Sequence, residues 1–290
     1  MGYLGVDIGG SFIKYCGRAG GDIKKGKIPT EKGFDSILKA LRTLVKDFSP
    51  ERLGLGVAGL YDQKTGRLTA SPNIRFLEGI DLKEILEEEL GIPVIIQNDA
   101  SAAALGEYRY GAGKGAEILV CFTLGTGLGG GLVVNGRLVS GVSGSAMEIG
   151  HTTIDVDGWY CHCGRKGCLE AYVSSYGLER FYFFLTDQKL DSAEIILLAN
   201  EGKLEAMKTL EEFSRYLAVG IMNVLHIFNP DRVVIGGGIP QHYPAVIDLA
   251  VSNLKKMAFE LPFRDVQILK AELGEYSGAY GALVLSEEGL

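Results

Sequence analysis

Apolar residues recur along the chain with two different spacings, and segments of the two kinds alternate almost from end to end. Short apolar runs are typical of buried strands, whereas apolar residues three and four positions apart are typical of one face of an amphipathic helix. The alternation predicts an α/β architecture. Strands are expected at residues 4–7, 12–16, 53–57, 94–97, 118–124, 132–135 and 232–235. Helices are expected at residues 34–48, 82–90, 100–110, 204–228 and 277–287.

Two segments of the chain share one pattern. The segments LGVDIGGSFIKYCG, from Leu4, and CFTLGTGLGGGLVVNG, from Cys121, each place a glycine-rich turn between two apolar strands. The similarity suggests a duplicated hairpin at the head of two related domains. A glycine-rich stretch at residues 111–115 is typical of a hinge. We therefore expect a smaller first domain of residues 1–115 with the C-terminal helix at about 277–290, and a larger second domain of residues 116–276.

The composition narrows the class of protein. The 290 residues are 47% hydrophobic, enough for a substantial core. With 36 acidic and 29 basic residues the net charge is −7, which argues against a general nucleic-acid-binding surface. The chain begins without the apolar core of a signal peptide, and its apolar runs are shorter than the roughly 18 residues of a membrane helix. We expect a cytoplasmic protein with neither a nucleic-acid nor a membrane partner.

A cluster of cysteines predicts a metal site. Cys161, Cys163 and Cys168 fall within eight positions, and His151 precedes them by ten. Three sulfurs and one imidazole form the closed tetrahedral set of a structural zinc site. His162 is a competing ligand, although its position between two cysteines makes convergence of all three awkward. The alternative is a group of reduced surface thiols.

Three glycine-rich segments could hold phosphates or a nucleotide. They are DIGGSFIK at residues 7–14, GTGLGGG at 125–131 and GGG at 236–238. Turns of this kind expose backbone N–H groups to an anion. Neither of the first two matches the Walker or dinucleotide-binding pattern, and each alone is equally consistent with an ordinary tight hairpin. The third follows a strand and could admit a nucleotide base or ribose.

Asp99 is the candidate general base. It follows a buried strand where a helix begins, at the sheet edge where α/β proteins bind ligands. Asp99 could take a proton from a substrate hydroxyl, or it could merely cap the helix. Other polar side chains suit a polyhydroxylated ligand, because each hydroxyl both donates and accepts. They are Asn73, Asn98, Glu148 and Glu170.

Taken together, these motifs resemble the ROK family of sugar kinases and transcription repressors, within the actin, hexokinase and heat-shock ATPase superfamily. The similarity covers nearly the whole chain. The residues that show it are Asp7-Ile8-Gly9-Gly10-Ser11, Gln97-Asn98-Asp99-Ala100, Glu148-Ile149-Gly150-His151 and the run from Cys161 to Glu170, together with Ser71-Pro72-Asn73 and Asn98 to Glu107. The stretches at Ser71 and Asn98 are similar to the glucokinase branch in particular. The resemblance implies a two-domain actin-like (ribonuclease H-like) ATPase fold with a cleft between the domains.

The resemblance also implies a role for each motif. Asp99 would be the base on the 6-hydroxyl of a sugar, and Asp7 would lie near Mg²⁺. Sugar contacts would come from Asn73, Asn98, Asp99, Glu148, His151 and Glu170. ATP contacts would come from Asp7, Gly9, Gly10, Ser11, Lys14, Gly125, Thr126, Gly127, Gly236, Gly237 and Gly238. Zinc would be held by His151, Cys161, Cys163 and Cys168, with His151 also serving the sugar.

Three features depart from the family pattern. Ser11 replaces the commoner threonine, and Met147 stands where a glycine usually precedes the glutamate. The first glycine turn begins at residue 7, so we expect the repressors' DNA-binding domain to be absent.

The expected activity is ATP-dependent phosphorylation of the 6-hydroxyl of a hexose, with glucose favoured. The alternatives are a kinase for N-acetylmannosamine, N-acetylglucosamine, mannose or fructose, and a non-catalytic sugar sensor. A homodimer or higher homo-oligomer is expected from the resemblance.

Overall fold

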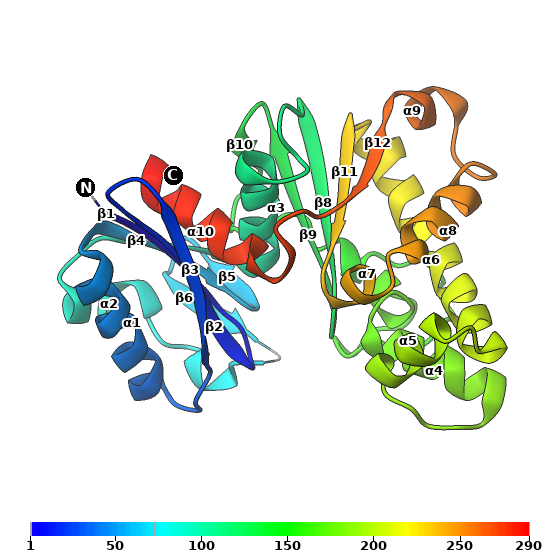
Figure 1. Cartoon of the computed structure of the whole chain (residues 1–290), viewed down its shortest axis with the longest axis horizontal. Helices are drawn as coiled ribbons and strands as arrows, with labels where there is room; N and C mark the ends of the chain where they lie inside the picture. The colour runs from blue at the N-terminus through cyan, green and yellow to red at the C-terminus, as the bar shows by residue number, and fades with distance from the viewer. Residues whose placement is uncertain (1, 72, 290) are drawn as a thin grey trace. The chain divides into compact units, whose positions relative to one another are not determined.

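The computed structural model describes residues 2–71 and 73–289 (Figure 1). Pro72 of the predicted Ser71-Pro72-Asn73 motif lies outside the described residues, as do Met1 and Leu290 at the ends of the predicted domains. The chain divides into two compact units. The first comprises residues 1–114, 131–147 and 275–290, and the second comprises residues 115–130 and 148–274. The predicted domains, residues 1–115 with 277–290 and residues 116–276, stay a prediction, because compact units do not show which parts of the chain fold independently.

The first unit is built around a five-stranded sheet in the order β3-β2-β1-β4-β7. Its strands are β1 (Gly2–Ile8), β2 (Phe12–Ala19), β3 (Ile23–Pro29), β4 (Pro50–Val57) and β7 (Val94–Asn98). β1, β4 and β7 run parallel, while β2 is antiparallel to both β1 and β3. The helices are α1 (Phe34–Phe48), α2 (Leu82–Leu90), α3 (Asp99–Tyr110) and α10 (Ser277–Glu288). A separate hairpin pairs β5 (Leu60–Asp62) with β6 (Arg67–Ala70).

Side chains of the central strands point alternately to the two faces of the sheet, and each face is covered by its own layer of helices (Figure 1). Leu4, Val6 and Ile8 are buried in the core that α1 and α2 share with the sheet. The intervening Gly5 faces α10, because successive residues of a strand point to opposite faces. A Cβ at Gly5 would lie 1.9 Å from the backbone nitrogen of Leu283. Glycine is therefore required where the helix backbone packs directly on the strand.

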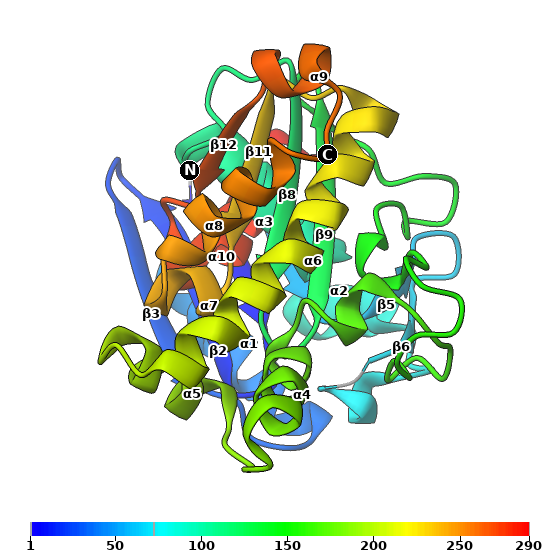
Figure 2. The same cartoon turned by 90° about the vertical axis from the view of Figure 1, so that its right-hand side faces the viewer.

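The second sheet has the strand order β10-β9-β8-β11-β12. Its strands are β8 (Ile118–Leu124), β9 (Leu128–Val134), β10 (Arg137–Leu138), β11 (Arg232–Gly236) and β12 (Gln267–Lys270). β8, β11 and β12 are parallel, and β10 is antiparallel to β9. The helices of the second unit are α4 (Ser175–Thr186), α5 (Ser192–Asn200), α6 (Leu204–Phe228), α7 (Gly238–His242), α8 (Ala245–Leu254) and α9 (Glu260–Asp265). Figure 2 shows α6 and α8 in front of β8 and β11. Short 3₁₀ helices span Arg75–Leu77, Ile149–His151, Leu169–Ala171 and Gly274–Tyr276.

The predicted α/β class is confirmed, with one correction to the glycine-rich segment at residues 125–131. Only Gly125, Thr126 and Gly127 form the turn, because β9 already begins at Leu128. Gly131 lies inside that strand, and a Cβ there would come 2.5 Å from the Cβ of Ala104 in α3. That glycine serves close packing. Among the described residues, none of the helices has the length and apolar character needed to cross a bilayer.

Candidate functional site

Two carboxylates, Asp7 and Asp99, come from the same edge of the first sheet. Asp7 pairs with Gly56 of β4, and Gly56 pairs with Gln97 of β7. Asp7 is therefore level with the end of β7, after which Asp99 begins α3. A Cβ at Gly56 would lie 3.5 Å from Asp7 Oδ1, so the middle strand leaves room for the side chain. Parallel strand direction thus brings the predicted base and the predicted magnesium ligand to one edge.

Asn98 is the N-cap of α3. Its Oδ1 accepts the backbone N–H groups of Ala100 at 2.9 Å and Ser101 at 3.1 Å, while its Nδ2 donates to the carbonyl of Gly59 at 3.0 Å. Asp99 Oδ1 accepts the same Ala100 N–H at 2.9 Å. Asp99 is therefore not needed as the cap, which was the alternative to a role in proton transfer.

The surroundings make both carboxylates unusually basic. Desolvation by burial, followed by the charge of Asp99, raises the pKa of Asp7 to about 7 against the opposing effect of Lys14. Burial raises the pKa of Asp99 to about 6, although hydrogen bonds from the backbone and Asn98 and the charge of Lys14 lower it. Both side chains remain partly exposed, so a ligand can reach them. A carboxylate with a pKa near 6 suits a general base at neutral pH.

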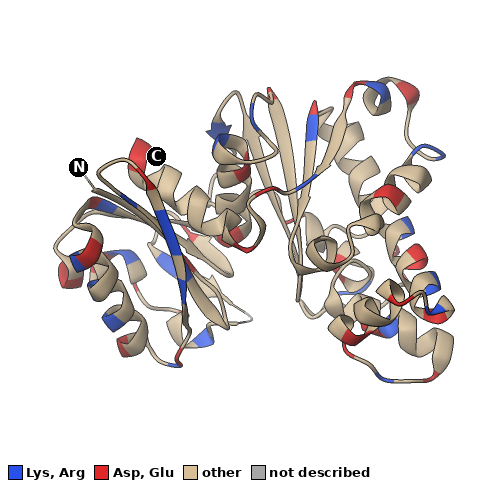
Figure 3. Cartoon of the chain, viewed as in Figure 1, with Lys and Arg blue, Asp and Glu red and all other residues tan. Residues whose placement is uncertain are grey.

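Lys14 is held beside this pair by an ion pair. Its Nζ lies 3.9 Å from Glu275, which also accepts hydrogen bonds from Lys27 of β3 at 3.0 and 3.1 Å. Blue segments along β3 in Figure 3 mark the basic character of this strand. Glu275 thus lies between two cations at the end of the sheet.

The first glycine turn has an exposed backbone. Gly9 donates its N–H to Phe12 at 3.1 Å, and Thr30 holds the turn from the side by hydrogen bonds to Gly9 and Ser11. Gly10 packs close to Asn73, since a Cβ at Gly10 would lie 3.0 Å from the Asn73 Cβ. The predicted phosphate turn and a predicted sugar contact therefore lie side by side in the first unit.

The second glycine turn, Gly125–Gly127, is held by hydrogen bonds and close packing within the second unit. Gly125 donates to the carbonyl of Gly127 at 3.0 Å. Leu128 donates its N–H to Glu170 Oε2 at 3.0 Å. A Cβ at Gly127 would lie 2.6 Å from that oxygen. The turn therefore packs directly on a predicted sugar-binding carboxylate.

The third glycine segment joins β11 to α7. Gly237 has a φ of +99°, and a Cβ there would lie 2.1 Å from the carbonyl oxygen of Leu124. Glycine is required at this position by both its conformation and its packing. At Gly238 a Cβ would meet no other atom within 4 Å, so the start of α7 is open.

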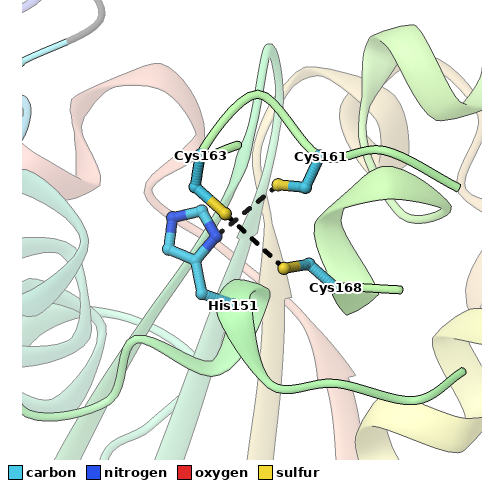
Figure 4. Close-up of side chains that lie close together, drawn as sticks. All are labelled: His151, Cys161, Cys163 and Cys168. Atoms are coloured by element: carbon cyan, nitrogen blue, oxygen red, sulfur yellow. Dashed lines mark hydrogen bonds between the residues drawn. The ribbon is translucent and has the colours of Figure 1, made fainter. Parts of the chain in front are cut away.

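The predicted zinc ligands converge in the second unit. The ligand atoms of His151, Cys161, Cys163 and Cys168 all lie within 4.8 Å of one another (Figure 4). Cys163 Sγ lies 3.6 Å from Cys168 Sγ, and His151 Nδ1 lies 3.8 Å from Cys161 Sγ. Tetrahedral zinc places its sulfur and nitrogen ligands roughly 3.5–3.8 Å apart. Both the donor set and the spacing therefore fit zinc.

The local fold explains this convergence. An isolated bridge pairs Tyr160 with Lys166, and Cys161 donates its N–H to Arg165 at 2.8 Å, so the loop closes on itself. Gly167 has a φ of +68°, and a Cβ there would lie 1.5 Å from the carbonyl oxygen of Asp155. The competing ligand His162 is outside the group of four and stacks on Tyr176, with ring centroids 3.9 Å apart.

The remaining predicted acids flank the cysteine loop. Glu148 caps the 3₁₀ helix that ends at His151, which donates its N–H to the Glu148 carbonyl at 3.0 Å. Glu170 Oε1 lies 3.4 Å from Cys161 Sγ. Glu148, His151 and Glu170 therefore belong to the second unit, whereas Asp7, Asp99 and the two asparagines belong to the first.

No role was predicted from the sequence for Glu107, the fully buried residue near the end of α3 with which the Asn98 to Glu107 motif ends. Its Oε1 accepts the Ser277 hydroxyl at 2.8 Å, and its Oε2 accepts the N–H of Ala112 at 3.0 Å. The carboxylate thus ties the helix that begins at Asp99 to α10. The sequence feature that could have indicated this role is a single acidic residue at the end of an alanine-rich run.

The fold and the motifs agree with comparisons to known proteins. A sequence model described as the ROK family matches residues 3–288. The chain therefore belongs to the ROK family, which confirms the resemblance, and it has the two-domain actin-like fold of the family's sugar kinases.

Three relatives illustrate the range of the family. The chain is 31% identical to a glucokinase of Streptomyces coelicolor, over 98% of this chain and 97% of that protein. It is also 31% identical to an N-acetyl-D-glucosamine kinase of Aliivibrio salmonicida, over 98% and 99%. Among solved structures, a Streptomyces griseus ROK glucokinase in complex with glucose and AMPPNP superposes with a TM-score of 0.86. That match has 32% identity and covers 100% of both chains.

Proposed function

We propose that this protein is an ATP-dependent sugar kinase that phosphorylates the 6-hydroxyl of a hexose, with glucose as the favoured substrate. The observation that carries the proposal is the Asp7–Asp99 pair, in which burial raises the pKa of Asp99 to about 6. Family membership and the glucokinase relatives support the same reaction class.

In this mechanism Asp99 accepts the proton of the 6-hydroxyl as the oxygen attacks the terminal phosphoryl group of ATP. Lys14, which lowers the pKa of both carboxylates, supplies positive charge near the transferred group. Backbone N–H groups of the turns at Gly9–Ser11 and Gly125–Gly127 stabilise charge on the phosphates. Gly236, Gly237 and Gly238 would lie against the adenosine.

Two metal ions would support this chemistry. The carboxylate of Asp7 is the kind of oxygen ligand that Mg²⁺ prefers, and bound Mg²⁺ would neutralise charge on the phosphates. The Cys₃His group would hold zinc as a structural ion. Because Nδ1 of His151 faces Cys161, its Nε2 would remain to meet a sugar hydroxyl, and metal binding would fix that tautomer.

The sugar would be recognised by hydrogen bonds from Asn73, Asn98, Asp99, Glu148, His151 and Glu170. Kinases for N-acetylmannosamine, N-acetylglucosamine, mannose or fructose use the same types of group, so the substituent at C2 is the open question. The N-acetyl-D-glucosamine kinase relative keeps that alternative in view. We also propose that the protein acts as a homodimer or higher homo-oligomer.

Sugar-dependent release of ADP tests the proposal. Purified protein with ATP and Mg²⁺ should release ADP when glucose is added, and a panel of hexoses and N-acetylhexosamines should rank glucose first. A different leading sugar would reassign the substrate within the family. Sugar binding without any sugar-dependent ADP release would instead favour a non-catalytic sensor.

A further inference from the structure

The first turn of α4 is connected by hydrogen bonds to both ends of the second glycine turn. Ser175 donates its N–H to the carbonyl of Gly125 at 2.8 Å. The next residue, Tyr176, donates its hydroxyl to Glu170 Oε1 at 3.2 Å. The other oxygen of Glu170 accepts the N–H of Leu128 at 3.0 Å. The helix therefore reaches one end of the turn directly and the other end through Glu170.

Packing leaves this link little freedom. The backbone at Gly127 lies against Glu170 Oε2, where a Cβ would come within 2.6 Å. On the other side, the ring of Tyr176 is stacked on His162. The Tyr176 hydroxyl also lies 3.5 Å from Cys161 Sγ. It has one proton to donate, and Glu170 Oε1 at 3.2 Å is both the nearer acceptor and a charged oxygen.

We propose that Tyr176 is a positioning residue that holds Glu170 against the second glycine turn and so links the sugar-binding carboxylate to the phosphate-binding turn. This inference rests on the proposed kinase function. One oxygen of Glu170 is fixed by Tyr176 and the other by the turn. A sugar that binds Glu170 and a nucleotide that binds the turn therefore both favour the one arrangement of Glu170 and the turn that this link allows. Binding of the two ligands is then coupled, and the coupling is reciprocal.

Tyr176→Phe tests the link because it removes one hydroxyl and keeps the ring stacked on His162. We expect the KM for ATP to rise about tenfold, the loss typical of a hydrogen bond to a charged group. We expect kcat to stay within about twofold, and AMPPNP to tighten glucose binding less than in the wild type. Tyr182→Phe, on the same helix, is the matched control and should leave these values unchanged. Equal kinetics in the two variants would overturn the proposal.

A double variant tests whether Tyr176 affects ATP binding through Glu170 or through another contact. If Tyr176 acts through this carboxylate, Tyr176→Phe combined with Glu170→Gln should raise the KM for ATP no further than Glu170→Gln alone. Multiplied effects would overturn the proposal. Should Tyr176→Phe fail to fold, Glu170→Gln still tests the link, because it should raise the KM for ATP as well as that for sugar. A change in the KM for sugar alone would overturn it.

The zinc content of Tyr176→Phe should equal that of the wild type. Loss of metal would assign the effect to the Cys₃His group and overturn the positioning role. Failure of the proposed function is recognised separately, because the wild-type protein itself would then release no ADP in response to sugar.

Discussion

Replacing Asp99 with asparagine should remove most turnover while making the folded chain more stable at neutral pH. The side chain keeps its shape, and its oxygen can still accept the Ala100 N–H that Asp99 accepts at 2.9 Å. The substitution removes the negative charge and the ability to take a proton from the substrate. Sugar binding should survive, because the amide oxygen still accepts a hydrogen bond from a sugar hydroxyl.

The gain in stability follows from the pKa of Asp99, which burial raises from 3.8 to about 6. A carboxyl whose pKa is higher in the folded chain than in the unfolded chain favours folding when it is protonated. Its contribution is complete below pH 3.8 and is lost as the pH rises through about 6. A shift of about two units corresponds to at most ~3 kcal/mol, since each unit is worth about 1.4 kcal/mol. Partial exposure of the side chain reduces this value.

Urea unfolding at several pH values, together with sugar-dependent ADP release, checks both halves of this prediction. Asp99→Asn and the wild type should be equally stable below about pH 4, and the variant should be more stable above about pH 6. Asp62→Asn is a control of opposite sign, because hydrogen bonds from Lys64 and Thr65 lower the pKa of Asp62. Turnover within a few-fold of the wild type, or no added stability at pH 7.5, would refute the reasoning. In the wild type, kcat should fall about tenfold per pH unit below about 6.

Three further predictions concern the metal centre and the packing of α3 on α10. Chelation of zinc should change the emission of Trp159, the single tryptophan, which stacks on Tyr172 beside the cysteine loop with centroids 4.7 Å apart. It should also lower the unfolding temperature, and unchanged emission in metal-free protein would contradict a structural zinc. Glu107→Ala should destabilise the protein by about 3 kcal/mol in urea unfolding, with Glu107→Gln much milder, because the alanine variant removes the buried acceptor of two hydrogen bonds that the amide can still accept in part. Gly281→Ala should cost about 3 kcal/mol, because its Cβ would lie 1.6 Å from a backbone oxygen of α3, whereas Gly238→Ala, with open space around it, should be nearly neutral by the same measurement.

Periodicity alone predicted the parts of the fold that are buried on one side. The helix at Phe34–Phe48 has the predicted bounds, because its apolar face packs on the first sheet and gives a clear helical repeat. β3 escaped prediction because it is an edge strand. Its sequence IKKGKIP places three lysines where a central strand would have apolar residues, and most of its positions are exposed.

The candidate site was predictable where its chemistry lies in short motifs. The cysteine spacing indicated the Cys₃His group, since the loop that gathers these ligands is local in sequence. The sequence also identified the adjacent residues Asn98 and Asp99 as candidates. It could not show that Asn98 caps α3, because that depends on the geometry of the side chains. The link from Tyr176 through Glu170 to Leu128 left no pattern, because its members come from three separate segments.

The placement of Asp7 and Asp99 shows why the fold keeps so many small residues around them. The charge of Asp99 raises the pKa of Asp7 at the same sheet edge, and Lys14 opposes that effect only in part. Larger neighbours would force the carboxylates to move, as at Gly278, where a Cβ would lie 2.7 Å from Asp7 Oδ2. Close packing by α10 contributes to the burial that raises the pKa of Asp7, although the side chain remains partly exposed. The same packing that stabilises the first unit thus helps to raise the pKa of Asp7, which shares its sheet edge with the proposed base Asp99.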